Sequence, residues 1–120
     1  MRTLGLDIGE RRTGVAFNDS AINIPFPLDT ITADSKEEMI AQVELIARER
    51  KVDRIVVGLP LLPSGDEGSQ AHYVRSCAAN LEQLGFPIDF LDERYTTVDS
   101  KEYDGDARAA CQLLQTYHRL

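Results

Sequence analysis

Three acidic positions in this 120-residue sequence have the residue type and setting to bind a metal ion: Asp7, the pair Asp92-Glu93, and Asp106. Asp7 lies inside an apolar stretch that is typical of a strand. A lone carboxylate buried in such a stretch costs several kcal/mol unless it is paired or binds a cation. Asp7 is therefore the strongest single candidate for a functional residue.

Carboxylate oxygens are ligands that Mg²⁺ and Mn²⁺ prefer, and both ions complete their shells with water and substrate phosphate. With two such ions, one activates a water for in-line attack on a phosphodiester and the other stabilises the leaving oxygen, so no protein nucleophile is needed. If Asp7, the Asp92-Glu93 pair and Asp106 converge, the sequence predicts a metal-dependent phosphodiesterase.

Each acid also has a purely structural interpretation. Asp7 could end a hairpin and accept hydrogen bonds from backbone amides. The triplet Asp92-Glu93-Arg94 could be a surface turn with a weak ion pair, and Asp106 could be the N-cap of the last helix. Only the joint placement of the acids separates these interpretations from a metal site.

The net charge of -7 argues against nucleic-acid binding, because phosphate binding depends on Lys and Arg releasing counterions. Bound divalent ions reverse this charge locally. Arg11 and Arg12 follow Asp7, and Arg94 follows the second acidic position. Arginine binds phosphate with a two-pronged fork, so we expect these three residues to contact substrate.

Several uncharged residues are further candidates for substrate contact. Gly58 and Pro60 lie between an apolar stretch and a helix start, where free backbone amides favour anions, although this loop does not match the GxxxxGK[ST] pattern of nucleotide-binding loops. Thr96 and Thr97 could contact phosphate or cap a turn. The candidate substrate-binding residues are thus Arg11, Arg12, Gly58, Pro60, Arg94, Thr96 and Thr97.

The elements that must position these residues follow from the apolar pattern. Residues 3 to 8 and 13 to 19 read as two antiparallel strands, and residues 21 to 31, which contain two prolines, as an edge strand or a partly irregular stretch. Helices are predicted at about 35 to 50, 69 to 84 and 107 to 118, and strands at 54 to 57 and 88 to 91. This order predicts an α/β fold with a mixed five-stranded sheet, three antiparallel strands followed by parallel strands, and helices on both faces.

The length fits one domain, residues 1 to 120. The N-terminus has no secretory signal pattern and no stretch long enough to span a membrane, so a cytoplasmic protein is expected. Cys77 and Cys111 lie in apolar-periodic stretches without the spacing of a zinc site, so both are expected to be buried, reduced thiols. His72 and His118 are expected at the surface, and Arg75 on the second helix is a solvated arginine or a phosphate contact.

Four motifs, in order, resemble the YqgF/RuvX family over nearly the whole chain. They are Leu4-Gly5-Leu6-Asp7-Ile8-Gly9-Glu10-Arg11-Arg12-Thr13-Gly14-Val15-Ala16, Val57-Gly58-Leu59-Pro60, Asp92-Glu93-Arg94-Tyr95-Thr96-Thr97, and Asp106-Ala107-Arg108-Ala109-Ala110 with Leu113-Leu114-Gln115. The resemblance implies an RNase H-like fold and a bacterial nuclease that matures the 5′ end of pre-16S rRNA during ribosome biogenesis. Some members are linked to Holliday-junction resolution instead.

By this resemblance, Asp7, Glu93 and Asp106 fall where the family's catalytic metal ligands lie, and Glu93 is preferred to Asp92 on that ground alone. The implied cofactor is Mg²⁺ or Mn²⁺, and the implied partner is structured RNA or branched DNA. The resemblance also implies a monomer or homodimer that does not associate with a membrane. In one respect the chain departs from the family. Only Val98 to Gly105 separate the Thr-Thr pair from Asp106, where the family has a longer helix and a basic stretch.

Two other functions compete with the nuclease. The acidic charge and the short connection before Asp106 are also compatible with a non-catalytic RNA- or ribosome-associated module. A fragment of a sugar-kinase-like or actin-like ATPase would share the DxG motif, but those proteins need two domains, for which 120 residues leave no room.

Overall fold

The structure is a computed structural model and describes residues 1–92 and 105–119. Its elements, in chain order, are β1 (Arg2–Ile8), β2 (Arg12–Asp19), β3 (Phe26–Pro27), β4 (Ile31–Thr32), α1 (Lys36–Glu49), β5 (Arg54–Leu59), α2 (Ser69–Gln83), β6 (Ile88–Asp92) and α3 (Gly105–His118).

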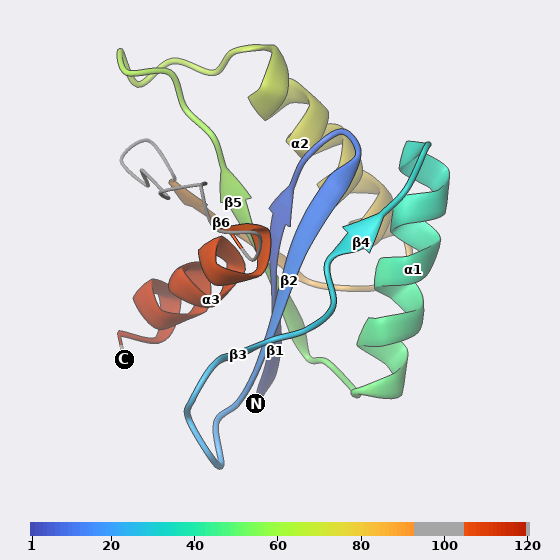
Figure 1. Cartoon of the computed structure of the whole chain (residues 1–120), viewed down its shortest axis with the longest axis vertical. Coiled ribbons are helices and arrows are strands. Elements are labelled where there is room, and N and C mark those ends of the chain that lie inside the picture. Colours follow the sequence, from blue (N-terminus) through green and yellow to red (C-terminus); the bar gives the residue numbers. More distant parts are fainter. Residues whose placement is uncertain (93–104, 120) are drawn as a thin grey trace.

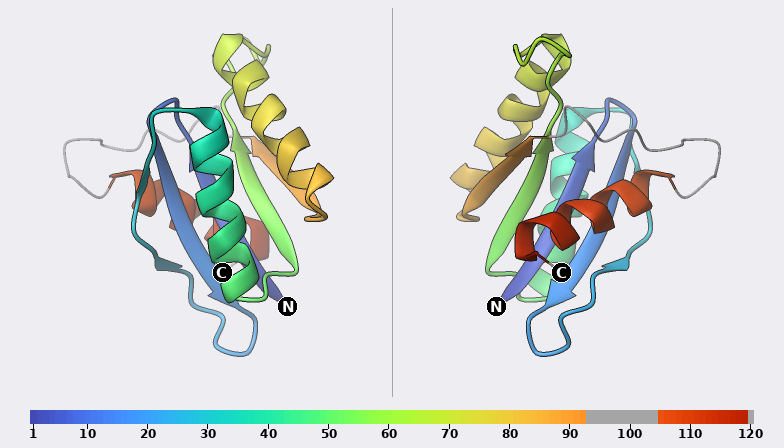
Figure 2. Two further views of the ribbon diagram at one scale, coloured as in Figure 1. Left: turned by 90° about the vertical axis from the view of Figure 1, so that its right-hand side faces the viewer. Right: turned by 90° about the vertical axis from the view of Figure 1, so that its left-hand side faces the viewer.

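Within the described ranges, six strands form one mixed sheet in the order β3-β2-β1-β5-β6, and β4 also pairs with β2. β1 pairs antiparallel with β2 and parallel with β5, and β5 pairs parallel with β6. Helices α1 and α2 cover one face of the sheet, and α3 crosses the other (Figures 1 and 2). The predicted α/β fold with helices on both faces is confirmed.

The sheet differs from the prediction at its third extended stretch, which forms two strands of two residues each instead of one longer strand. Both strands pair with β2, at Phe17↔Phe26 and Thr13↔Ile31. Pro25 and Pro27 lack a backbone N–H and cannot donate to the ladder. The edge of the sheet is therefore paired only in short pieces.

The core has two parts because the central strands are covered on both faces. Leu4, Leu6 and Ile8 of β1 pack on the side of α1 and α2. The smaller cluster on the α3 side is built from Ala16, Val56, Ala110 and Leu114. Successive strand residues point to opposite faces. The residues of β1 that alternate with Leu4, Leu6 and Ile8 therefore face α3, and these are Thr3, Gly5 and Asp7.

Helix α1 begins as its sequence predicts. The Ser35 hydroxyl accepts a hydrogen bond from the Glu38 backbone N–H at 3.1 Å, and the Glu38 carboxylate accepts one from the Asp34 N–H at 3.2 Å. We expect Ser35→Ala to lower the free energy of unfolding by about 1 kcal/mol, because an amide of the first turn loses its partner. Urea unfolding measures this change, and Ser35→Thr, which keeps a hydroxyl at the N-cap, is the control and should change stability much less.

Three single-residue expectations have mixed outcomes. Cys77 is buried and Cys111 half-buried, and both are free thiols whose pKa is raised by burial. The expectation that His118 lies at the surface is wrong. This residue is half-buried, and its Nε2 lies 2.9 Å from the hydroxyl oxygen of the fully buried Thr3. The last turn of α3 packs against the start of β1, which accounts for this burial.

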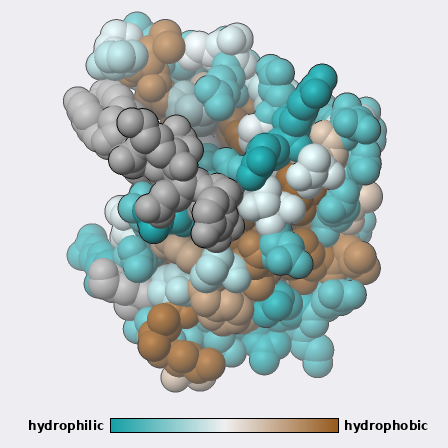
Figure 3. Space-filling model, in the orientation of Figure 1, coloured by the Kyte–Doolittle hydropathy of each residue, from teal (hydrophilic) through white to brown (hydrophobic). Residues whose placement is uncertain are grey.

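On the surface shown in Figure 3, apolar atoms gather at the lower end, over the connection between β2 and β3. Ile22 and Ile24 of this connection are each 65% exposed. Among the helices that the structure describes, none has both the length and the apolar character needed to cross a membrane.

Candidate active site

The site is built on the end of β1 that carries Asp7. Three contacts along β1 fix where α3 runs: Asp106 acts electrostatically on Asp7, Ala110 and Leu114 approach Gly5, and His118 reaches Thr3. Helix α3 thus runs back along β1 from Asp7 towards Thr3. Its first turn, which holds Asp106, is placed beside Asp7.

Gly14 makes this placement possible. It pairs directly with Asp7 across the β1–β2 ladder. A Cβ atom at position 14 would lie 1.8 Å from the Asp106 carbonyl oxygen, a distance that no side chain tolerates. The backbone of the first turn of α3 therefore rests directly on β2, next to the strand position of Asp7.

Burial and the neighbouring charge of Asp106 raise the pKa of Asp7 to about 6 from its usual 3.8, burial being the larger cause. Both effects disfavour the charged form of a carboxyl group. Among the described residues no hydrogen bond reaches the Asp7 carboxylate, so the interpretation of Asp7 as a hairpin-end acid bonded to backbone amides is not supported. A half-buried carboxylate that is close enough to a second carboxylate to feel its charge is an arrangement that a divalent cation would stabilise.

Arg12 and Asp106 form an ion pair at this edge of the site. The Arg12 Nε donates to Asp106 Oδ2 at 2.8 Å, and the two side chains are 57% and 33% exposed. Asp106 is the second residue of α3, inside its first turn, so its interpretation as the N-cap is wrong. Arg11, at the tip of the β1–β2 turn, is exposed, and its side chain has no ion pair within the described part of the chain.

The end of β5 lies beside Asp7, where the substrate loop is predicted. β1 and β5 are in register up to Leu6↔Val57, so the next residues, Asp7 and Gly58, lie near the ends of two neighbouring strands. Gly58 is buried, and Pro60 follows the end of β5 and is half-buried. Of the predicted substrate-binding residues, Arg11, Arg12, Gly58 and Pro60 thus lie at the same end of the sheet as Asp7.

β6 does not neighbour β1, because β5 lies between them. Along β6, Phe90 packs against the core under α1 and α2, and Leu91 packs against the cluster under α3. Strand alternation gives Asp92 the phase of Phe90. Asp92 therefore belongs to the face opposite Asp7.

Four predicted site residues, Glu93, Arg94, Thr96 and Thr97, lie outside the described residues. In the described part of the chain, no group of three or more His, Cys, Asp or Glu side chains has the geometry of a metal site. Asp7 and Asp106 are thus the two predicted ligands that the structure places together.

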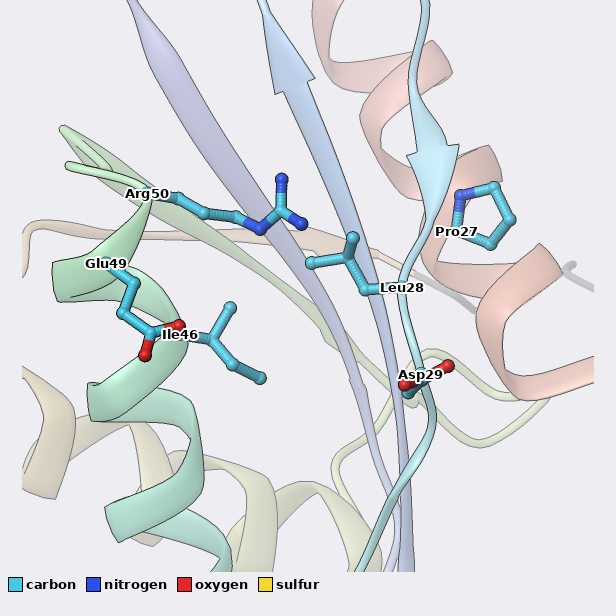
Figure 4. A pocket seen from close by; sticks show the side chains of 6 residues that line it. All are labelled: Pro27, Leu28, Asp29, Ile46, Glu49 and Arg50. Carbon is cyan, nitrogen blue, oxygen red and sulfur yellow. The ribbon is translucent and has the colours of Figure 1, made fainter.

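Two other features lie away from this site. Arg75 binds the Glu67 carboxylate through two nitrogens, at 2.6 and 2.7 Å, so the structure favours its role as a structural ion pair. A pocket of about 310 Å³ lies between the C-terminal end of α1 and the segment around β3 (Figure 4). It is lined by Pro27, Leu28, Asp29, Ile46, Glu49 and Arg50. None of these is a predicted site residue.

Sequence reasoning missed two features of the site, the support of α3 by Gly14 and the bond between Arg12 and Asp106. Gly14 could have been found from the sequence, because a hairpin between residues 8 and 13 pairs it with Asp7. The Arg12 contact joins residues 94 positions apart, and only the path of α3 across the sheet brings them together.

Comparison with known proteins finds one family that spans nearly the whole chain. The sequence profile of a family described as "RuvX: Holliday junction resolvase" matches residues 1–119. A protein of Chloroflexus aurantiacus named "Putative pre-16S rRNA nuclease" is 45% identical over 100 residues, which cover 82% of this chain and 65% of that protein. A protein of the same name from an Anaeromyxobacter species is 36% identical over 129 residues, covering 96% of this chain and 94% of the relative.

The solved structures show the same fold at low sequence identity. RuvC of T. thermophilus, in complex with a Holliday junction substrate, superposes with a TM-score of 0.67 at 11% identity, covering 99% of this chain and 96% of that one. The large terminase nuclease of the thermophilic phage G20c superposes with a TM-score of 0.54 at 13% identity, covering 97% and 55%.

The chain spans about two thirds of the length of the Chloroflexus relative and nearly the whole of the Anaeromyxobacter one. The family match extends over almost every residue, and it includes the strand of Asp7, the end of β5 and the helix of Asp106. On this evidence the chain belongs to the RuvX family.

Proposed function

We propose that this protein is a metal-dependent nuclease that hydrolyses phosphodiester bonds. The observation that carries the proposal is the placement of Asp7, half-buried in the sheet and without a hydrogen-bond donor among the described residues, beside Asp106 on α3. At neutral pH, a carboxylate in this setting lowers the stability of the folded protein. Such destabilising arrangements of ionisable groups are typical of catalytic metal centres.

Asp7 and Asp106 would hold the cation together with Glu93, and carboxylate oxygens suit Mg²⁺ or Mn²⁺. Such ions, in a pair, supply activation of water and stabilisation of the leaving oxygen. Asp7 would contribute an oxygen ligand from near the end of β1, a central strand of the sheet. Asp106 would contribute one whose position depends on the close contact of α3 with Gly14.

The phase of β6 supports Glu93 over Asp92 as the third ligand, because Asp92 belongs to the face opposite Asp7. We expect Glu93→Gln to lower the cleavage rate by more than about 100-fold, since a lost ligand removes several kcal/mol of charge stabilisation. Asp92→Asn is the matched control and should change the rate by less than about 3-fold. The reverse ranking of the two variants would show that Asp92 is the ligand.

The proposed substrate is structured RNA, and the proposed process is 5′-end maturation of pre-16S rRNA in the cytoplasm. This choice is supported by the names of the relatives from Chloroflexus and Anaeromyxobacter. The second candidate is a branched DNA, favoured by the family description. Arg11 and Arg12 would contact backbone phosphate in either case, because phosphate contacts carry no sequence information.

The test is a cleavage assay with purified protein on two labelled substrates, a pre-16S 5′-end RNA and a four-way DNA junction. Each is incubated with Mn²⁺ and, separately, with EDTA. We expect cutting of the RNA that requires Mn²⁺. Faster cutting of the junction would reassign the substrate to DNA, and binding of RNA without cutting of either substrate would favour a non-catalytic module.

A further inference from the structure

Arg12 contacts Asp106 through one nitrogen only. Its Nε donates to Asp106 Oδ2 at 2.8 Å, whereas Arg75 binds Glu67 through both Nε and Nη2. Among the described residues, neither the two terminal nitrogens of Arg12 nor Asp106 Oδ1 has another partner. With respect to the described residues, the pair thus leaves one carboxylate oxygen and one guanidinium edge without a partner.

Arg12 is also well placed to reach a substrate. It is the first residue of β2, two positions before Gly14, and strand alternation gives both residues the same face of the sheet. The Arg12 side chain is 57% exposed, while the carboxylate that it holds lies beside the half-buried Asp7. The guanidinium is therefore in contact with both Asp106 and the solvent.

We propose that Arg12 is a positioning residue that makes two contacts at once. Its Nε holds Asp106 Oδ2 and leaves Oδ1 for the divalent cation, and its terminal nitrogens bind the substrate phosphate that shares this cation. The inference rests on the proposed function and adds to it a link between cation binding and phosphate binding. An oriented carboxylate binds the cation better, and the cation and Arg12 then neutralise the same phosphate.

Arginine suits this role better than lysine. The guanidinium is planar and presents five N–H donors in fixed directions, so two different acceptors can be bound on different edges. A lysine ammonium carries the same charge on one nitrogen at the end of a flexible stem. Arg12→Lys therefore keeps the local charge and removes the geometry, which separates positioning from electrostatic attraction.

The first measurement is Mn²⁺ binding by calorimetry, which does not depend on catalysis. Arg12→Lys is expected to bind Mn²⁺ about 10-fold more weakly than wild type, because loss of a partner that orients a ligand costs affinity on this scale. The control is Arg48→Lys, an arginine of α1 that is 56% exposed and paired with Glu44 away from the site, which should stay within about 2-fold. Thermal melting checks that all three proteins fold alike.

The second measurement is binding of a fluorescent structured RNA in Ca²⁺ or in EDTA. Wild type and Arg48→Lys should bind the RNA more tightly in Ca²⁺, and Arg12→Lys should lose most of this increase. Unchanged or tighter Mn²⁺ binding by Arg12→Lys, or an unchanged Ca²⁺ effect on its RNA binding, would overturn the role of Arg12 alone. Absence of Mn²⁺ binding by wild type would overturn the proposed function and this inference with it.

Discussion

Asp7→Asn is expected to stabilise the metal-free protein at neutral pH, by about 2 to 3 kcal/mol. The pKa of Asp7 rises to about 6 in the folded protein from 3.8, and each unit of such a shift corresponds to about 1.4 kcal/mol. A raised carboxyl pKa favours folding below pH 3.8, where both states hold the proton. As the pH rises from 3.8 to 6, Asp7 loses its proton in the unfolded chain before it does so in the folded protein. The contribution of this group to stability is therefore lost over this range. Asparagine keeps the shape and removes the charge.

The gain should therefore depend on pH. Urea unfolding in EDTA should show no difference between Asp7→Asn and wild type at pH 4, and the full difference above pH 6. Asp19→Asn is a control of opposite sign, because the Ala21 backbone N–H and Arg2 lower the pKa of Asp19. Asp19→Asn should therefore lower the free energy of unfolding at neutral pH. A destabilised Asp7→Asn variant at pH 8 would contradict the burial of an unpaired charge at this position.

Gly14→Ala is expected to have the second large effect, a loss of at least about 2 kcal/mol of stability together with loss of cleavage. The added Cβ would meet the Asp106 carbonyl oxygen at 1.8 Å, so the first turn of α3 must move away from β2. Displacements of this kind in a packed contact cost about 1 to 3 kcal/mol. Asp106 would move away from Asp7 at the same time.

A matched glycine separates this effect from a general effect of alanine. In Gly68→Ala the new Cβ would meet only the flexible Leu62 side chain, at 3.3 Å or more, and we expect a loss below about 1 kcal/mol. Urea unfolding and Mn²⁺-dependent cleavage check both variants. Wild-type cleavage by Gly14→Ala would show that the contact between α3 and β2 does not position Asp106.

The sequence predicted the elements well because the apolar periods are clear. The run from Met39 to Ala47 has helical spacing, and the buried Ile55 to Val57 has no polar residue. It overestimated the edge strand, since Pro25 and Pro27 limit the ladder to short pieces. The exposure of His118 was also misjudged, because its burial depends on a contact with Thr3, which lies 115 positions away in the chain.

The sequence was better at predicting which residues belong to the site than which residues contact one another there. Asp7 could be predicted because a charged residue in an apolar strand requires a specific reason. Its closeness to Asp106 follows from the path of α3 over Gly5 and Gly14, which no local pattern specifies. The sequence alone could not tell which face of the sheet Asp92 belongs to, because this depends on the phase of β6 relative to the rest of the sheet.

The most direct test of the proposed function is Mn²⁺-dependent cleavage of a pre-16S 5′-end RNA by wild type and by Asp7→Asn at pH 8. The Asp7→Asn protein should be folded, and by the shift in the pKa of Asp7 more stable than wild type, so lost activity cannot be attributed to unfolding. We predict a cleavage rate lower by more than about 1000-fold, as expected for loss of a central metal ligand. Equal cleavage by the two proteins would contradict the assignment of Asp7 to a catalytic metal site.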